Sequence, residues 1–333
     1  MMKDDETATL VLDREFIACH VPPSAYLAAV EDAFRRLARR ELDVPAVGHV
    51  PGVDGGFHIK AAVSRRAPRH AAIKVNGNFP DNDARRGLPT IHGFIALLDA
   101  ECGRVLALMD STEITARRTA ATSALAAQRL ARSDARRLAL IGCGKQARHH
   151  LDAFEGIFPL TDVALFDRVA ERAHELAAVA AAKGLAAAVA TSPAAACAAA
   201  DIIVTCTPSR TPLFAAHDVR AGTFIAAVGA DNPDKQELSV DLLRRARVVP
   251  DILTQAIHMG DLHHAIAAGI MTAGQIHGEL ADVVAGMTPG RQTSDEIFVF
   301  DSTGAAITDL AAADVVYAQA QREGTAPRFR LNG

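Results

Sequence analysis

The sequence predicts an α/β protein in which a doubly wound parallel sheet is joined to a second, α+β domain. Three observations support this fold class. The middle of the 333-residue chain alternates short apolar segments with helical ones, the first third holds glycine-punctuated strands instead, and half of all residues are apolar. A chain of this length and composition can bury two hydrophobic cores.

The parallel sheet is predicted from apolar segments in the middle of the chain. Strands are expected in RRLALIGCG, DVALFDR, AAVATS, DIIVTCTPS and GTFIAAVGA. Helices are expected after the first and second of these, in KQARHHLDAF and VAERAHELAAVAAAKG. Strands without polar alternation, separated by helices, are typical of βαβ units with both sheet faces covered.

An amphipathic helix and a separate sheet are predicted for the N-terminal part. The helix is expected in SAYLAAVEDAFRRLARR, capped by Ser24, and its apolar face consists of Leu27, Val30, Phe34 and Leu37. Strand-like segments follow in FHIKAAV, AAIKVNGNF and HGFIALLD. Because no long helices separate these strands, an antiparallel or mixed sheet is expected.

A long helix that passes from one domain into the other is predicted in DSTEITARRTAATSALAAQRLARS. Asp110, followed three residues later by Glu113, resembles a capping box at its start. Arg117 can pair with Glu113 one helical turn back. Arg118 is therefore the better candidate for binding a substrate carboxylate through two hydrogen bonds.

Composition excludes several classes of protein. A net charge of -4 leaves no basic footprint for nucleic acid. The longest apolar stretch is interrupted by Lys183 and Gly184, and the acidic N-terminus has no signal-like apolar core. Five cysteines lie far apart without a CxxC pair, as in a protein with reduced thiols. We therefore expect a cytoplasmic protein with neither nucleic-acid nor membrane partners.

Histidine clusters are not expected to bind a metal. His258, His263 and His264 have poor helical spacing for one ion, so we interpret them as solvent-facing residues at the start of a helix. His149 and His150 follow the first glycine loop, and core packing and exposure account for them. The sequence thus predicts no metal site.

The loop after the first strand of the parallel sheet has the pattern of a Rossmann-type dinucleotide site. Gly142, Gly144 and Ala147 occupy the positions where such loops need a tight turn, close approach to the pyrophosphate, and close helix packing. The alternative is a purely structural turn, since a lone GxG is common after a strand.

A carboxylate at the end of the next strand supports the dinucleotide interpretation. Asp167 can accept hydrogen bonds from the ribose hydroxyls. It favours NAD, because a carboxylate repels the 2′-phosphate of NADP, and the neighbouring Arg168 leaves NADP as the alternative.

Two further residues are candidates for the chemistry. Lys74 lies inside an apolar, strand-like run, where a buried ammonium requires an anionic partner. That partner is either a substrate or, in the alternative, a protein carboxylate. Asp231 follows the strand AAVGA and so lies at the carboxyl edge of the parallel sheet, where ligands bind in open α/β folds. Its alternative role is to cap the turn before Pro233.

Taken together, these motifs resemble the ornithine cyclodeaminase and mu-crystallin family from about residue 40 onward. The likeness is carried by KVNGNFPDN with GLPTIHG, LLDAECGRVLALMDSTEITARRTAA, GCGKQA, DIIVTCTPS, AVGADNPDKQEL and FDSTGAAITDLAAA. The resemblance implies a homodimer of two-domain subunits. Residues 1–119 with 311–333 would form the substrate-binding and dimerisation domain, and residues 120–310 the NAD(P)-binding Rossmann domain.

The resemblance also implies roles for individual residues. Lys74 and Arg118 would hold the substrate carboxylate or an attacking water, and Asp231 would donate and accept the proton. The residues expected to contact NAD(P) are Arg118, Thr119, Gly142, Cys143, Gly144, Lys145, Gln146, Asp167, Thr207, Lys235 and Ser302.

The sequence departs from the family pattern where relatives grip the substrate. The segment DVPAVGHVPG lacks the expected arginine, for which Lys60 is a candidate substitute unless it is merely solvated. The glutamate that would receive the distal ammonium of ornithine is also missing, and the acid found there, Asp54, is expected to face solvent. We therefore expect NAD(P)H-dependent reduction of a small α-imino acid, or the reverse oxidation. The alternatives are ornithine cyclodeamination with release of ammonia, or weak, non-catalytic ligand binding as in mu-crystallin.

Overall fold

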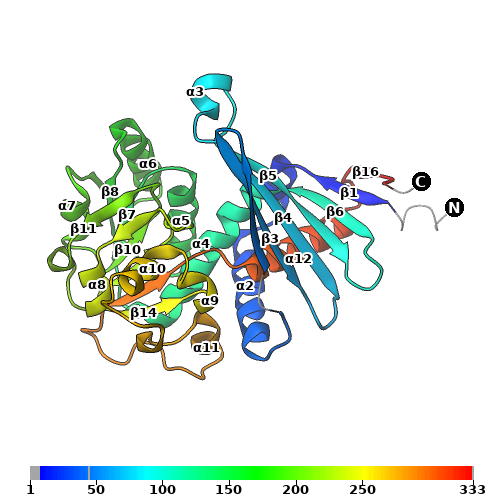
Figure 1. Ribbon diagram of the computed structural model, residues 1–333. Coiled ribbons are helices and arrows are strands. Elements are labelled where there is room, and N and C mark those ends of the chain that lie inside the picture. Colours follow the sequence, from blue (N-terminus) through cyan, green and yellow to red (C-terminus); the bar gives the residue numbers. More distant parts are fainter. Residues whose placement is uncertain (1–7, 44–45, 332–333) are drawn as a thin grey trace. The chain divides into compact units, whose positions relative to one another are not determined.

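The structure, a computed structural model, describes residues 8–43 and 46–331 (Figure 1). Two compact units can be distinguished in the chain. Unit 1 consists of Met1–Arg118 with Ala305–Gly333, and unit 2 of Thr119–Gly304. The boundary after Arg118 falls inside the helix α4 (Ser111–Leu130), which confirms the long helix predicted in this region.

Unit 1 is built around a mixed sheet, in the order β16-β1-β6-β5-β4-β3-β2. Its strands are β1 (Thr9–Leu12), β2 (Ala46–Gly52), β3 (Gly55–Val63), β4 (His70–Asn78), β5 (Ile91–Asp99), β6 (Val105–Asp110) and β16 (Arg328–Phe329). Its helices, besides the start of α4, are α1 (Arg14–His20), α2 (Pro23–Ala38), α3 (Asn82–Arg86) and α12 (Ala306–Glu323). The pair β1 and β6 is parallel and the other pairs are antiparallel, so the prediction of an antiparallel or mixed sheet is confirmed.

The helix α2 forms where predicted, but its cap differs. Val30 and Phe34 are fully buried, as the apolar periodicity predicts. The prediction that Ser24 caps the helix is wrong, because the helix already begins at Pro23 with Pro22 at the N-cap position and no side-chain cap. Proline is favoured in the first turn because its missing N–H would have no helical partner there.

The two faces of the unit 1 sheet differ in character. The helix α12 packs on β3, β4 and β5 and against α2, and it covers one face (Figure 1). The opposite face, called the outer face here, carries alternating apolar side chains. Its exposed large members are Val11, Val50, Phe57, Val63, Ile73 and Phe94.

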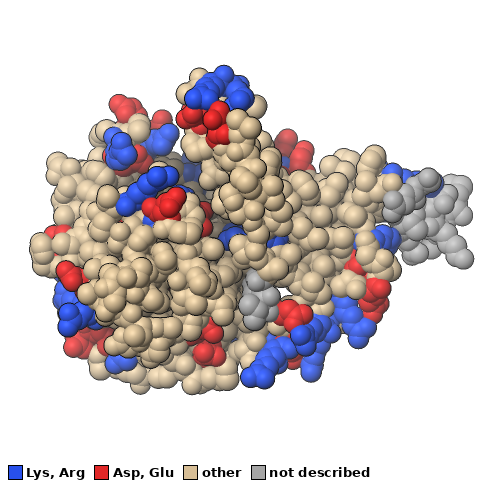
Figure 2. Space-filling model, in the orientation of Figure 1, with Lys and Arg blue, Asp and Glu red and all other residues tan. Residues whose placement is uncertain are grey.

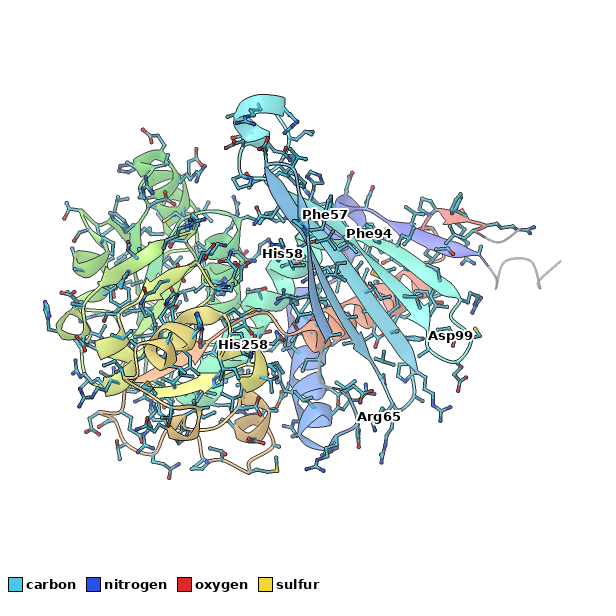
Figure 3. The ribbon with its side chains drawn as sticks, in the orientation of Figure 1. Phe57, His58, Arg65, Phe94, Asp99 and His258 are labelled. Carbon is cyan, nitrogen blue, oxygen red and sulfur yellow. The ribbon has the colours of Figure 1, made fainter. Side chains whose placement is uncertain are left out.

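Figure 3 shows Phe57 and Phe94 of the outer face on β3 and β5, the strands on either side of β4. In the space-filling view of Figure 2 the area over these strands is mostly uncharged. Each of these two phenylalanines has at least 40% of its surface exposed. An apolar area of this kind on one sheet face is unusual for a surface that stays in water.

The start of α4 follows the prediction closely. The amide of Glu113 donates to Asp110 Oδ1 over 2.8 Å, which confirms that Asp110 caps the helix. Arg117 Nε lies 2.7 Å from Glu113 Oε1, which confirms the predicted pair one helical turn apart.

Every residue of unit 2 is described, and its main sheet is parallel throughout, in the order β14-β15-β12-β10-β7-β8-β9. These strands are β7 (Arg137–Ile141), β8 (Asp162–Phe166), β9 (Ala186–Val189), β10 (Ile202–Thr205), β12 (Phe224–Ala227), β14 (Arg247–Pro250) and β15 (Phe298–Asp301). A smaller parallel pair consists of β11 (Arg210–Phe214) and β13 (Gln236–Leu238). The parallel sheet and the strands predicted for it are confirmed.

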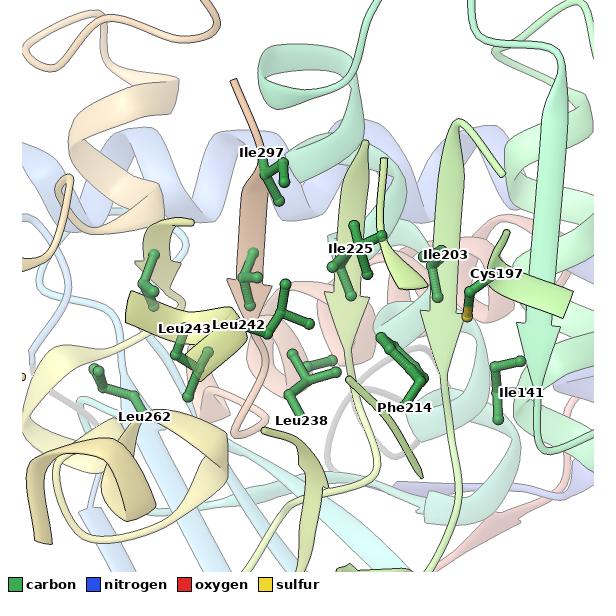
Figure 4. Close-up of a cluster of buried hydrophobic side chains, with 14 of the residues drawn as sticks. Ile141, Cys197, Ile203, Phe214, Ile225, Leu238, Leu242, Leu243, Leu262 and Ile297 are labelled. Atoms are coloured by element: carbon green, nitrogen blue, oxygen red, sulfur yellow. The ribbon is translucent and has the colours of Figure 1, made fainter. Parts of the chain in front are cut away.

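Helices pack against this sheet, and apolar side chains of strands and helices form the core between them. The helices are α5 (Lys145–Glu155), α6 (Ala170–Ala182), α7 (Pro193–Cys197), α8 (Val240–Arg245), α9 (Leu253–Ala256), α10 (Gly260–Ala267) and α11 (Leu280–Val284), with 3-10 turns η1 (Ala216–Asp218) and η2 (Ala273–Gln275). Figure 4 shows part of the core, in which Ile203 and Ile225 of neighbouring strands pack near Phe214 and Leu238 of the small strand pair. The core thereby fixes β11 and β13 beside the main sheet.

Along the main sheet of unit 2 the chain changes direction between β9 and β10. From β7 the chain proceeds to β8 and β9 on one side, and from β10 to β12 on the other. In open α/β sheets ligands bind at the carboxyl ends of the strands where the order reverses, here β7 and β10. Among the described residues, no helix is both long and apolar enough to span a membrane.

Candidate active site

The glycine loop after β7 lies against the loop after β10. Gly142 has φ +89°, and a Cβ on it would lie 2.7 Å from the carbonyl oxygen of Cys206 and 2.9 Å from Cγ2 of Thr207. Only glycine fits this backbone and this close approach. Gly144 is the N-cap of α5 and has no side chain that would compete for the helix amides, and such amides bind phosphate groups.

Asp167 is held at the same edge of the sheet, just after β8. Its Oδ2 accepts a hydrogen bond of 2.7 Å from the amide of Cys143, and its Oδ1 one of 2.8 Å from the amide of Val169. These bonds fix the carboxylate beside the glycine loop. Arg168 next to it is exposed.

A buried carboxylate that sequence reasoning missed, Glu237 on β13, connects the loops after β10 and β12. Its Oε1 accepts from the amide of Thr207 over 2.6 Å, and its Oε2 accepts from the hydroxyl of Thr205 and the amide of Gly229, each over 2.7 Å. Glu237 is fully buried, and this burial raises its pKa. It thereby fixes the loops from which Thr207 and Asp231 extend.

Asp231 lies just beyond Gly229 and forms an ion pair with a second predicted site residue. Lys235 Nζ is 2.7 Å from Asp231 Oδ1, and the Asp231 side chain is 51% exposed. The predicted alternative, a cap for the turn before Pro233, is fulfilled by another residue, since Asn232 Oδ1 accepts from the amides of Asp234 and Lys235. Asp231 therefore has its carboxylate on the surface of unit 2.

Apart from Arg118, which belongs to unit 1, the other residues expected to contact the cofactor lie in unit 2 as well. Thr207 and Ser302 follow β10 and β15, and the amide of Ser302 donates to the carbonyl of Ala227 over 2.9 Å. Lys145 and Gln146 form the first turn of α5. Thr119 is buried on α4.

In unit 1 two buried cations meet one buried carboxylate. Lys74 Nζ lies 2.7 Å from Asp309 Oδ2, and Arg118 Nε lies 2.9 Å from Asp309 Oδ1. All three residues are at most 4% exposed. The expected anionic partner of Lys74 is thus present, in the form of a protein carboxylate, which was the alternative considered above.

Burial and the neighbouring charges place the pKa of Lys74 close to neutral pH. Burial is the largest cause that lowers the pKa of Lys74, to about 7, with Arg118 and Lys60 lowering it further and Asp309 raising it. For Asp309, burial acts to raise the pKa, but the cations Arg118 and Lys74 bring it below the ordinary value. Lys74 therefore changes between the ammonium and the neutral amine form near neutral pH.

Lys60 belongs to the same region of unit 1. It lies on β3 directly opposite Lys74 on β4, so both side chains share the sheet face covered by α12. Lys60 is half-buried and influences the pKa of both Lys74 and Asp309. Asp54, in contrast, is exposed, as expected, and pairs with Arg85 over 3.1 Å.

The histidines differ in part from the prediction. His263 and His264 are half-buried rather than solvent-facing, because their rings lie within 3.2 Å and 2.8 Å of the carbonyl oxygens of Ile257 and Lys235. His258 is exposed (Figure 3). In the described part of the chain no group of three or more potential ligands is arranged to hold a metal ion.

Fold and site together define a two-domain, Rossmann-type protein with a dinucleotide-type loop and a separate cluster of buried cations. Residues 8–324 match the model of the ornithine cyclodeaminase/mu-crystallin family. The chain belongs to this family, which confirms the resemblance seen in the sequence.

Three solved structures show which relatives the chain resembles. An archaeal alanine dehydrogenase dimer with bound NAD has a TM-score of 0.93 and 34% identity, covering 97% of this chain and 99% of that one. The Δ1-pyrroline-2-carboxylate reductase of Thermococcus litoralis with NADH and L-proline has a TM-score of 0.91 and 30% identity, covering 96% and 99%. The iminosuccinate reductase of Paracoccus denitrificans with NAD+ has a TM-score of 0.89 and 33% identity, covering 96% and 99%.

Proposed function

We propose that the protein is an NAD(P)H-dependent reductase of small α-imino acids, which also catalyses the reverse oxidation of the amino acid. A bound nicotinamide would supply the hydride for the imine carbon, and Asp231 would supply the proton for the imine nitrogen. Unit 1 binds the substrate and unit 2 binds the dinucleotide in this proposal. The relatives named above bind NAD or NADH, and two of them are named as reductases of imino acids.

The observation that carries the proposal is the cluster formed by Lys74, Arg118 and Asp309. Two cations with at most 4% exposure are unusual in a protein core, where each costs free energy unless it is paired. Arg118 and Lys60 both lower the pKa of Lys74, so a bound substrate carboxylate would offset mutual repulsion between these cations. An α-imino acid supplies that carboxylate next to the carbon that accepts the hydride.

The cofactor assignment is supported by the glycine loop and Asp167. Gly142 and Gly144 leave room at the amino end of α5 for the pyrophosphate. The fixed carboxylate of Asp167 can accept the ribose hydroxyls and would repel a 2′-phosphate. We therefore infer a preference for NADH over NADPH.

Ornithine cyclodeamination, the reaction after which the family is named, is less well supported by the residues present. The distal ammonium of ornithine needs a carboxylate that accepts its hydrogen bonds. The one acid in the segment 45–63, Asp54, is exposed and paired with Arg85. Lys60, half-buried on the adjoining strand, would repel an ammonium instead. Lys60 therefore favours a compact substrate, including one with a second carboxylate.

The experiment that tests this function is a substrate panel. Pyruvate or glyoxylate with ammonia or methylamine, iminosuccinate, and preformed cyclic imines are each incubated with NADH and with NADPH. Steady oxidation of NADH that depends on the imine supports the proposal. Tight binding of the same compounds without turnover would instead support a ligand-binding protein like mu-crystallin.

We also propose that the chain forms a homodimer through the outer face. Apolar side chains such as Phe57 and Phe94 cover this face, and the archaeal alanine dehydrogenase of the same fold is a dimer. A second copy of the chain would remove these side chains from water. Replacing both phenylalanines by serine should yield monomers in sedimentation velocity, whereas Val53→Ser, in an exposed turn, should not. A double variant that stays dimeric would place the interface elsewhere.

A further inference from the structure

Asp309 contacts both cations of the buried cluster in unit 1, Lys74 and Arg118. It lies in the first turn of α12 and is 1% exposed. Each of its two oxygens takes a different cation, Oδ1 the Nε of Arg118 and Oδ2 the Nζ of Lys74. These cations come from α4 and β4, so Asp309 joins three separate elements of unit 1.

The contact with Arg118 uses one particular edge of the guanidinium. Nε carries a single hydrogen, and its bond to Asp309 sets the plane of the group. The two terminal nitrogens, which form the end-on pair of donors for a carboxylate, are not part of this bond. Asp309 can therefore orient Arg118 without occupying those donors.

The energetics do not favour a purely structural role for this cluster. Buried ion pairs are weak sources of stability, and well-packed apolar residues often replace them without loss. Three charged residues buried together, on β4, α4 and α12, are therefore better explained by a ligand that needs them.

We infer that Asp309 is a positioning residue, which orients Arg118 and keeps Lys74 protonated so that both can hold the carboxylate of the substrate. This inference rests on the proposed function. It adds to the substrate site a residue that itself contacts neither substrate nor cofactor.

The proton balance of Lys74 supports this role. Asp309 on α12 is the carboxylate that stabilises the ammonium, while Arg118 on α4 and Lys60 on β3 repel it. Burial is the largest cause that lowers the pKa of Lys74, which is about 7 with the raising effect of Asp309 included. Without the charge of Asp309 the lysine would be mostly neutral at pH 7 and would lose its attraction for a carboxylate.

The test is the pH dependence of imine reduction by Asp309→Asn, which keeps the shape but removes the charge. The decline of kcat/KM for the imino acid at high pH should begin at least one pH unit lower than in the wild type. Relative to the wild type, the variant should therefore lose at least about fivefold more activity at pH 8 than at pH 6. The KM for the imino acid should rise, while that for NADH should stay within twofold.

Asp314→Asn is the matched control. Asp314 lies on the same helix and pairs with His70 over 2.7 Å, so its replacement removes a carboxylate of α12 without touching the cluster. Its pH profile should match that of the wild type. A uniform loss of activity in Asp309→Asn at all pH values, or an unchanged profile, would overturn the inference.

A second variant distinguishes the effect of the position of the carboxylate from the effect of its charge. It also provides a test if Asp309→Asn does not fold. Asp309→Glu retains the charge but moves it by one methylene group. The KM for the imino acid should rise at least tenfold with the high-pH decline unchanged, and an unchanged KM would contradict the positioning role. If the wild type reduces no imine, the proposed function fails and the inference with it; an active wild type with unaltered variants contradicts the inference alone.

Discussion

His150 provides a prediction that connects the glycine loop to the stability of unit 2. Its ring is fully buried on α5, with Nδ1 2.8 Å from the carbonyl of Gln146 and Nε2 3.0 Å from the hydroxyl of Ser123 on α4. This arrangement suits a neutral ring that donates through Nδ1 and accepts through Nε2. Burial accordingly lowers the pKa of His150 from 6.5 to about 4.

A lowered pKa in the folded state means that stability is lost on acidification. Between about pH 6.5 and pH 4 the unfolded chain binds this proton and the folded chain does not, so the free energy of unfolding falls as the pH falls. With about 1.4 kcal/mol for each unit of pKa difference, the loss at pH 5 is about 2 kcal/mol. His150→Gln has no titrating ring and should lack this part of the pH dependence.

The assay is urea unfolding at pH 5 and pH 7, followed by far-ultraviolet circular dichroism because the chain has no tryptophan. Asp301 and Asp261 act in the opposite sense, since burial raises the pKa of each, but both are retained in the variant and cancel in the comparison. His149→Gln, next to the buried ring, is the control. If the wild type and His150→Gln lose equal stability between pH 7 and pH 5, the reasoning about His150 is refuted.

Three further predictions concern the reaction. NADH should exceed NADPH in kcat/KM, and Asp167→Ser should narrow the gap because it removes the carboxylate that repels a 2′-phosphate; equal use of both cofactors by the wild type would contradict this. Asp231→Asn should lower kcat by about 10²–10⁴-fold without loss of NADH affinity, and full turnover would assign the proton to another group. Conversion of L-ornithine to proline and ammonia should be slower than the best imine reduction by at least about two orders of magnitude. Comparable rates would restore the cyclodeaminase assignment.

Much of unit 2 could be predicted because its signals are local. The strand, glycine turn and helix around Gly142 are adjacent in the sequence, and the structure has them as β7 and α5. Glu237 has no such signal. Its role depends on the amide of Thr207, 30 positions away, and on loops that only the folded sheet brings together.

The cluster in unit 1 shows the same limit. The sequence indicated that Lys74 needs an anionic partner, but Asp309 lies 191 positions from Arg118 and has the local pattern of an acid in the first turn of a helix.

The strand β2 was not predicted, also because its formation depends on a partner segment. All its side chains are exposed, so it has no apolar alternation, and it forms because it pairs with β3 along its length.

The hydride transfer itself can be followed with NADH deuterated at the transferred C4 position. Incubation with an excess of each imine of the panel, followed by mass spectrometry of the amino acid formed, locates the label. The proposed reaction places one deuterium on the α-carbon of the product, with one NADH oxidised for each amino acid formed. If no imine of the panel yields an α-deuterated amino acid, the chain is not an imino-acid reductase.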